Sequence, residues 1–551
     1  MAWQRRNAPV ALLGAALLAA AVLLLALGSS YTFFQDTWAF LLDRQGNSAR
    51  DFLIPHNEHI VVIPVAIEKA LVGIFGMTTA APERVAMAAV LLTAGALMFV
   101  YVRRRVGPWV ALMAALLLLF LGSTWPVLLW PFEIGFAGSV MAGIAMLLLL
   151  ERDDRRGDAW ACLLLTISIG FGSVGLSFIA AAFVDFLQKR ERRGWRRAYV
   201  FAVPALLYLA WYAGWGHTAE HHLTLHNILM SPQYLLDGFA SSIDSLAGLS
   251  NIPVTAPGQP EWGRPLLVAL VALVIYGQYR RPGFSPAFWR SSAVAVSYWL
   301  LAAFNYIPGR EAASTRYVYA GAAFVLLMGA DLLRGVRFGR RALWIGAGLT
   351  LLALGPNLAQ MKDGANWLKE QSVLTRADTA ALEISRRTVP PAFTLSPDIA
   401  GTGSLAIVDA GQYFEAVDAH GSPAYSPQEL AGALPVARHW ADIVLARALP
   451  ITTSTHPAAA LAGDSSRCVT VPGGTGADIP EEQLEPGLTK IWLAPGPEAH
   501  LALRRFTTAE FPVDLGSVPG GSVTLLRIPR DTASQPWFLR LEAPQRARFC
   551  G

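Results

Sequence analysis

Long apolar stretches, separated by short polar or basic segments, fill the first two thirds of the chain. The first stretch, residues 8–27, follows Arg5 and Arg6 and is long enough to cross a bilayer, as a retained helix or as a signal peptide. Further stretches predict helices that each cross once, at residues 85–102, 108–124, 134–150, 195–216, 265–279, 288–306, 316–334 and 341–358. This pattern is typical of a polytopic α-helical membrane protein.

The segment 159–187 differs from the others, because basic residues lie at both of its ends. Small residues between Gly170 and Gly175 permit a tight turn in its middle. We therefore expect two short helices here, one that crosses to the outer face and one that crosses back to the basic side. With the other stretches they bring the total to about eleven crossings.

Residues after 361 are polar and rich in Pro, Gly, Ser and Thr. Segments 361–388 and 427–449 predict two helices, and the short runs from residue 467 to the end predict β-strands. Turn residues separate these runs at intervals that suit a β-sandwich or a jelly roll. The sequence thus predicts a transmembrane domain over 1–360 and an α+β domain over 361–551.

The distribution of basic residues predicts which side each loop faces. Segment 60–75 is apolar but contains Pro64, Glu68 and Lys69, and we interpret it as an amphipathic helix on the outer surface. If it crossed the membrane, every later basic segment would fall outside, against the positive-inside rule. These basic segments are 103–105, 151–158, 188–197, 278–283 and 334–341. We therefore predict a protein of the cytoplasmic membrane with a cytoplasmic N-terminus, an outer loop 29–83 and an extracytoplasmic C-terminal domain.

Composition supports this class of protein. Of 551 residues, 54% are hydrophobic and 15% are charged, whereas soluble domains have roughly 25% charged residues. The net charge is +5, and no Lys/Arg tract alternates with aromatic residues as a nucleic-acid surface requires. Cys468 and Cys550 lie in the first and last predicted strands, and an oxidising outer compartment favours a disulfide between them.

Charged residues concentrate in the predicted outer loops, so we look there for a functional site. Asp36 follows the first apolar stretch and Glu133 lies in the turn 125–135. A carboxylate at such a place could act as a general base for a sugar hydroxyl, or hold a metal beside a phosphate. Trp130 offers a flat surface for a sugar, although interfacial tryptophans also form aromatic belts.

Four further residues are candidates for substrate binding. Arg310 and Arg316 lie in the predicted outer loop 305–317, where guanidinium groups could bind a lipid-linked phosphate. Glu58 and His59 lie within the first outer loop. The histidines at 56–59 and 220–226 do not follow the HExxH zinc pattern.

The arrangement resembles the GT-C superfamily of integral membrane glycosyltransferases. The features that carry the resemblance are the long acidic outer loop after the first span, the second outer acid, the paired short spans and the outward β-rich domain. The resemblance implies catalytic roles for Asp36 and Glu133 and phosphate binding by Arg310 and Arg316. It also implies a polyprenyl-phosphate-linked sugar donor within the bilayer. The single Asp36 replaces the paired acidic motif of many members, so a divalent metal, Mg²⁺ or Mn²⁺ held by Asp36 and Glu133, stays an open option.

These features predict a transferase that moves a sugar to an envelope glycan, lipid or protein on the outer face. The alternative is a non-catalytic membrane protein. It would be a lipid or glycan exporter, or an assembly scaffold with a carbohydrate-binding outer domain. An exporter usually places carboxylates or broken helices in the middle of the membrane, and this chain concentrates charge at one interface.

Overall fold

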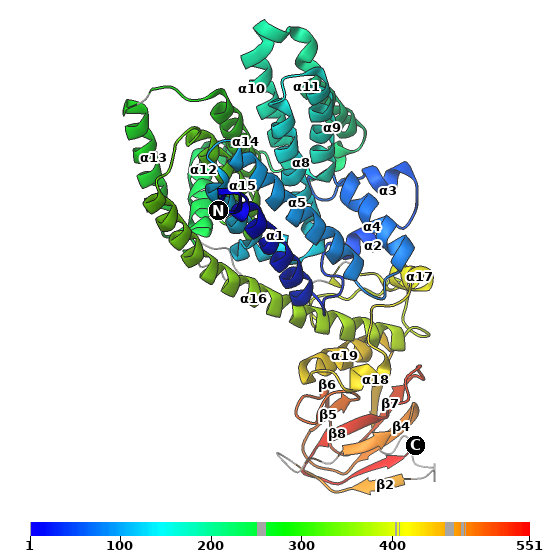
Figure 1. Cartoon of the computed structure of the whole chain (residues 1–551). Coiled ribbons are helices and arrows are strands. Elements are labelled where there is room, and N and C mark those ends of the chain that lie inside the picture. Colours follow the sequence, from blue (N-terminus) through cyan, green and yellow to red (C-terminus); the bar gives the residue numbers. More distant parts are fainter. Residues whose placement is uncertain are drawn as a thin grey trace. The chain divides into compact units, whose positions relative to one another are not determined.

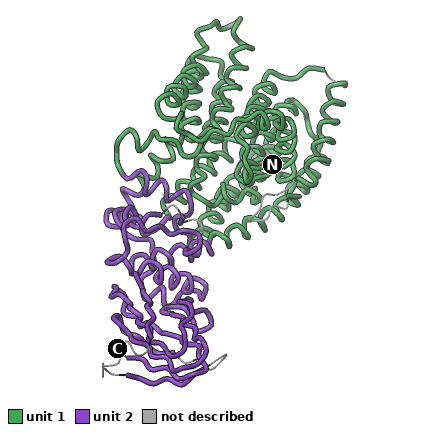
Figure 2. Tube along the Cα trace, turned by 180° about the vertical axis from the view of Figure 1, so that it is seen from behind, with its two compact units in different colours: residues 1–30, 46–71, 81–368 green, residues 31–45, 72–80, 369–551 purple. Residues whose placement is uncertain are grey.

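The chain forms two compact units, which are described separately (Figures 1 and 2). A computed structural model describes residues 2–250, 260–280, 282–402, 405–406, 408–457, 468–474, 479 and 481–550. Unit 1 is helical and comprises Met1–Ser30, Gly46–Leu71 and Ala81–Leu368. Unit 2 comprises Tyr31–Gln45, Val72–Ala80 and Lys369–Gly551, so it includes two pieces of the predicted outer loop 29–83.

Each apolar stretch of the sequence coincides with a helix, and the predicted helical character of this part is confirmed. The helices are α1 (Ala2–Leu27), α3 (Ala49–Leu53), α4 (Val62–Phe75), α5 (Ala81–Arg103), α6 (Pro108–Leu119), α7 (Trp125–Leu129), α8 (Ile134–Leu150), α9 (Arg155–Phe171), α10 (Leu176–Arg193), α11 (Tyr199–Gly214), α12 (Leu225–Leu246), α13 (Gly263–Arg280), α14 (Pro286–Phe304), α15 (Thr315–Leu332) and α16 (Arg340–Ile384). Part of the segment 217–264, which separates the predicted spans 195–216 and 265–279, lies outside the described residues.

Five helical stretches within the described residues are long and apolar enough to cross a membrane. They are Asn7–Leu27, Ala81–Arg103, Pro108–Leu129, Pro131–Leu150 and Arg340–Ile384. Helices α9 and α11 contain 17 and 16 residues, which reach about 24–26 Å at the helical rise, less than the roughly 30 Å of a bilayer core. The count of eleven crossings therefore stays a prediction.

The predicted turn within 159–187 joins α9 to α10 through a 3₁₀ turn at Ser173–Gly175. A Cβ atom on Gly175 would lie 2.4 Å from the main chain of Ser168, so the tight turn requires glycine there. Small residues also bring α8 against this pair of helices. A Cβ atom on Gly138 would lie 2.3 Å from the ring of Phe171, and Ser139 and Ser168 exchange hydrogen bonds through their hydroxyl groups.

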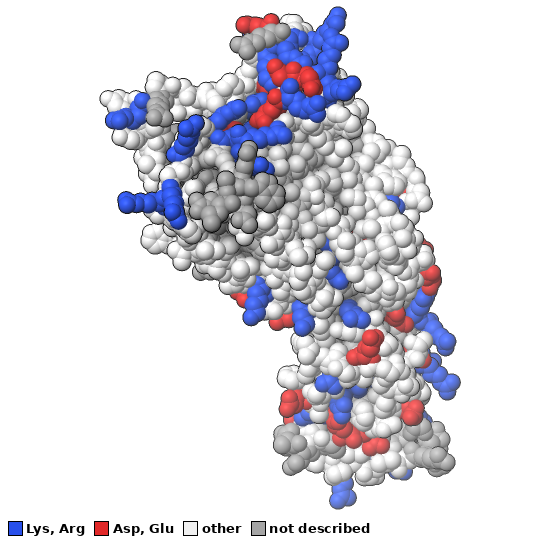
Figure 3. Space-filling view, viewed as in Figure 1, with Lys and Arg blue, Asp and Glu red and all other residues white. Residues whose placement is uncertain are grey.

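Ion pairs with buried carboxylates join the helix ends that carry the basic segments. Figure 3 shows Lys and Arg side chains gathered with Asp and Glu side chains on the surface at one end of unit 1. Asp185 of α10 pairs with Lys189, Arg197 and Arg290 at 2.5–3.1 Å. Similar pairs connect Arg105, at the end of α5, to carboxylates of two other segments, Glu151 and Asp331. The basic segments at 103–105, 151–158 and 188–197 therefore belong to one region of unit 1.

In its described residues, unit 2 combines short helices with nine strands. Its helices are α2 (Thr37–Leu42), α17 (Ala410–His420), α18 (Pro427–Ala431) and α19 (Pro435–Ala448). The strands are β1 (Thr452–Pro457), β2 (Cys468–Val471), β3 (Glu481–Leu484), β4 (Gly487–Leu493), β5 (Ala499–Arg504), β6 (Val513–Val518), β7 (Ser522–Ile528), β8 (Trp537–Glu542) and β9 (Ala547–Cys550). Trp38 of α2 is fully buried near the ring of Tyr413, which explains why segment 31–45 belongs to this unit.

The strands form two antiparallel sheets with the orders β1-β7-β4-β9-β2 and β3-β8-β5-β6. Without the edge strand β1, these orders are those of an eight-stranded jelly roll. Residues of both sheets, such as Leu526 and Trp537, share one buried core. Cys468 and Cys550 lie opposite each other in β2 and β9 and form the predicted disulfide.

Three predicted helices have the wrong limits. Segments 341–358 and 361–388 form one 45-residue helix, α16, which continues past Pro356. Asn357 stabilises this part, because its side chain accepts from the Ser123 N–H and donates to the carbonyls of Ser245 and Ala353. Segment 427–449 forms two helices, α18 and α19, because Pro435 begins a new helix as its first residue.

Candidate functional site

A two-residue turn presents Glu58 and His59 from the segment before α4. The main chains of His56 and His59 exchange two hydrogen bonds, with N···O distances of 3.0 and 2.9 Å. Asn57, within the turn, adopts a positive φ of 50°, a conformation that Asn tolerates better than most residues. The Trp211 indole of α11 donates to the Leu53 carbonyl at 2.7 Å, which fixes the preceding residues.

The Glu58 carboxylate forms an ion pair with Arg310, whose Nη1 lies 2.6 Å from Oε1. His59 Nε2 lies 3.5 Å from the same oxygen. Burial by itself would raise the pKa of Glu58, but the charges of His59 and Arg310 outweigh burial and lower it. The second oxygen, Oε2, is buried and has no hydrogen-bond partner among the described residues. Glu58 is therefore an ionised carboxylate with one buried oxygen that lacks a hydrogen bond among the described residues.

His59 lies beside this carboxylate as a neutral imidazole. Burial lowers its pKa to about 4, and the nearby charges of Arg316, His56 and Arg310 act in the same direction, against the attraction of Glu58. At neutral pH Arg310 is thus the cation that keeps Glu58 ionised. The Nδ1 atom of His59 is buried, and the described part of the chain offers it no hydrogen-bond partner.

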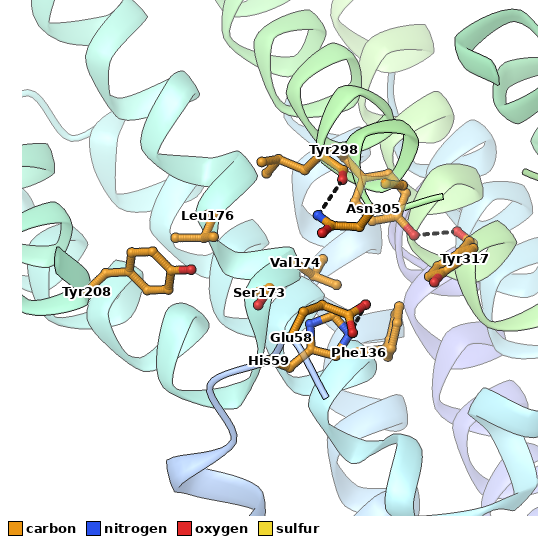
Figure 4. Close-up of a pocket in the computed structure, with 12 residues that line it drawn as sticks. Glu58, His59, Phe136, Ser173, Val174, Leu176, Tyr208, Tyr298, Asn305 and Tyr317 are labelled. Carbon is orange, nitrogen blue, oxygen red and sulfur yellow. Dashed lines mark hydrogen bonds and ion pairs between the residues drawn. The ribbon is translucent and has the colours of Figure 1, made fainter. Parts of the chain in front are cut away.

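The side chains of Glu58 and His59 line a pocket of about 610 Å³, a volume that includes the space at its open mouth (Figure 4). The pocket brings together the turn before α4, the start of α8, the α9–α10 turn and parts of α11, α14 and α15. Its walls are Glu58, His59, Phe136, Ser173, Val174, Leu176, Tyr208, Tyr298, Leu301, Ala302, Asn305 and Tyr317. The charge pattern of the sequence predicts every one of these segments to reach the outer face.

Some polar groups of the pocket wall are already engaged. The Tyr298 hydroxyl donates to the Tyr317 carbonyl at 2.8 Å, and the Asn305 amide donates to the Leu301 carbonyl at 3.1 Å. The Ser173 hydroxyl, in contrast, is buried and lacks a hydrogen bond within the described residues. Glu58, His59 and Ser173 thus each offer a polar atom to a ligand in this pocket.

The other predicted residues of unit 1 lie near the same turn. The charge of Arg316 acts on His59, and Glu133, which is buried, interacts electrostatically with Tyr298 and Tyr317. Trp130 stacks on Phe132, and the ring of Phe132 contacts His56. The structure therefore brings the turn 125–135 to the segment that carries Glu58 and His59.

Asp36 belongs to unit 2, where it is the residue before α2. Because Glu133 belongs to unit 1, the catalytic pair of Asp36 and Glu133 stays a prediction, as does a metal between them. Within the described residues, no three His, Cys, Asp or Glu side chains come together as ligands of a metal ion.

Sequence reasoning did not select five residues of this pocket, which are Ser173, Tyr208, Tyr298, Asn305 and Tyr317. Four of them lie in or beside predicted spans, where a single Tyr or Asn looks like an interfacial residue. The small residues of the turn at Gly170–Gly175 were the feature of the sequence that could have pointed to Ser173. A close turn at the predicted outer end of two helices can place its main-chain and hydroxyl groups beside a ligand.

Comparisons with models of protein families, with curated protein sequences and with solved structures find no match. The assignment of a site in this chain therefore depends on its own residues and their geometry.

Proposed function

We propose that this chain is a membrane glycosyltransferase of GT-C-like architecture. It transfers a sugar from a polyprenyl-phosphate carrier to an envelope glycan, lipid or protein on the outer face of the cytoplasmic membrane. The observation that carries this proposal is the pocket around Glu58. There an ionised carboxylate, whose second oxygen lacks a hydrogen bond among the described residues, lies beside a neutral imidazole and an arginine.

The transfer uses these groups as follows. An acceptor hydroxyl attacks C1 of the donor sugar, its proton passes to Glu58 Oε2, and the C1–O bond to phosphate breaks. The phosphate leaves with the electron pair of that bond, and Arg310 and Arg316 stabilise its charge. Glu58 thus takes the role of base that the sequence suggested for Asp36, while Asp36 and Glu133 remain candidates for positioning the donor or a metal.

The location of the charges supports an outward-facing site. The ion pairs of Asp185 and Arg105 gather the basic segments at one region of unit 1, whereas the pocket is built from the segments predicted to face out. Under the positive-inside rule the basic region is cytoplasmic. The donor then approaches the pocket from the outer leaflet.

A non-catalytic role remains the second candidate, because the jelly-roll order of unit 2 is also that of lectin domains. In that case unit 2 holds a glycan and the helical unit is an anchor or an exporter. A measurement of sugar transfer separates the two candidates.

The decisive variant is Glu58→Gln, which keeps the size of the side chain and removes its negative charge. We expect the rate of transfer from lipid-linked sugar to acceptor to fall by about 100-fold or more, because a general base contributes about that factor. The measurement is analysis of envelope glycans and lipid-linked sugars in cells that carry the variant.

Glu220→Gln is the matched control. Glu220 also faces Arg310, at 3.8 Å, but its side chain is 56% exposed and does not line the pocket. Its replacement should leave transfer within about twofold, in the range of surface substitutions. Unchanged products with Glu58→Gln would refute the role of Glu58. Loss of transfer with Asp36→Asn alone would assign the base to Asp36 instead.

A further inference from the structure

A second pocket of about 870 Å³ lies in unit 1 beside the loop that carries Arg310. Its walls come from α12, from the start of α13 and from the segment between α14 and α15. The lining residues are His226, Met230, Gln233, Tyr234, Asp237, Pro260, Arg264, Tyr306, Glu311, Ala312 and Ala313. No pattern in the sequence predicts this pocket, and none of its lining residues takes part in the proposed transfer.

The charges of this pocket differ from those around Glu58. Its wall contains two carboxylates, Asp237 and Glu311, and one cation, Arg264, which pairs with Asp237 at 2.8 Å. Glu311 accepts the Gly309 N–H through Oε1, while its Oε2 is buried without a hydrogen-bond partner in the described part of the chain. The wall is thus net negative, which disfavours a phosphate and favours a ligand that donates hydrogen bonds.

Aromatic and planar polar groups complete the wall. The rings of Tyr234 and Tyr306 meet edge to face, 5.9 Å apart, and Gln233 adds an exposed amide. Carboxylates and amides can bind pairs of neighbouring hydroxyl groups, and tyrosine rings can cover the apolar face of a sugar. This combination suits an uncharged saccharide.

Arg310 connects the two pockets. Its carbonyl accepts the hydroxyl of Tyr234 at 2.8 Å, and its side chain forms the ion pair with Glu58. Asn227 fixes the start of the same loop, because its amide donates to the carbonyls of His222 and Tyr306 at 2.8 and 3.0 Å. The loop is therefore held at both pockets, with Asn305 lining the first and Tyr306 the second.

We infer that the second pocket binds an uncharged, hydroxyl-rich saccharide of more than one residue, which serves as the acceptor of the reaction at Glu58. The acceptor role rests on the proposed function, whereas saccharide binding does not. A ligand of several residues reaches from the second pocket past Arg310 to the first. The net negative wall leaves the phosphate-linked donor to the first pocket, near Arg310 and Arg316.

Saccharide binding can be measured without a donor. The full chain in lipid nanodiscs is applied to an array of neutral and phosphorylated oligosaccharides. We expect binding to neutral oligosaccharides, and a loss of at least fivefold in affinity with Gln233→Ala, because the amide no longer bonds the sugar. Gln278→Ala on α13 is the control, since Gln278 does not line the pocket. It should bind like the parent chain.

Three results would overturn the inference. They are no binding to any neutral oligosaccharide, a preference for phosphorylated ones, or equal affinities of the Gln233→Ala and Gln278→Ala variants. The last result would place any saccharide in another part of the chain, such as the jelly roll. Saccharide binding that depends on Gln233, in a chain without transferase activity, would refute the proposed function alone. Transfer with no effect of Gln233→Ala would refute the second pocket alone.

Discussion

Glu58 and His59 show how neighbouring residues acquire different protonation from their surroundings. Both are withdrawn from water, but Glu58 faces Arg310, while His59 also meets the positive charges of Arg316 and Arg310. The outcome is a carboxylate that stays ionised and an imidazole that stays neutral at pH 7. Both side chains are therefore deprotonated at pH 7, and either can accept a proton without first losing one.

The buried, neutral His59 predicts a loss of stability in acid. Its pKa is about 4 in the folded chain and 6.5 as its ordinary value. Because the folded pKa is the lower one, the unfolded chain binds a proton first. The contribution of the neutral His59 to the free energy of unfolding is fully present above pH 6.5. It decreases by at most about 3 kcal/mol as the pH falls towards 4. Thermal unfolding between pH 7 and pH 4 measures this loss.

In this experiment His59→Gln should show a smaller decrease in Tm than the parent chain, because Gln does not titrate. His217→Gln replaces an exposed imidazole outside the pocket and should behave like the parent. Equal pH dependence of the two variants would show that His59 is not the group responsible.

At the scale of elements, the packing of short helices and the pairing of strands follow simple local causes. The α9–α10 turn depends on Gly175, and the contact of α8 with this pair depends on Gly138. In unit 2, strands β2 and β9 are neighbours in the five-stranded sheet, and Cys468 and Cys550 join them.

Removal of the disulfide should destabilise unit 2. The bond connects residues 82 positions apart, and closing such a loop contributes about 4–5 kcal/mol in the chain-entropy model. We expect Cys550→Ser to lower the midpoint of urea unfolding of unit 2. Cys162→Ser, which removes the free thiol of α9, is the control and should leave this transition unchanged. A transition that is equal in both variants would contradict the expected contribution.

At the scale of the whole molecule, the proposed orientation places the pockets outside and the basic region inside. Two single cysteines can test it, each introduced after Cys162→Ser so that no other free thiol remains in the described residues. Glu220→Cys, at the exposed residue near Arg310, should react with a membrane-impermeant maleimide on intact cells. Arg156→Cys, at an exposed position in the basic region, should react only after permeabilisation.

Labelling of both cysteines after permeabilisation shows that both are accessible, and it is the internal control of this experiment. The opposite pattern on intact cells, with Arg156→Cys labelled and Glu220→Cys protected, would reverse the orientation. The pocket would then face the cytoplasm, and a polyprenyl-phosphate donor of the outer leaflet could not reach it.

The sequence by itself determined the features that depend on neighbouring residues and on composition. Apolar stretches of about 20 residues set the helices, alternation and turn residues set the strands, and the position of two cysteines in a polar domain set the disulfide. For a site it named Asp36 and Glu133 first, with Glu58, His59, Trp130, Arg310 and Arg316 as candidates for substrate binding, and these roles stay predictions.

Only the tertiary structure decided how these residues combine. Glu58 and Arg310 are 252 positions apart, and no local pattern predicts that they form an ion pair. The burial of Trp38 in unit 2, the continuation of α16 past Pro356 and the second pocket depend in the same way on distant partners. Helical periodicity indicates which side of a segment is apolar, but it does not indicate which other segment packs against that side. The packing between segments supplies the free energy that holds the residues of a site together.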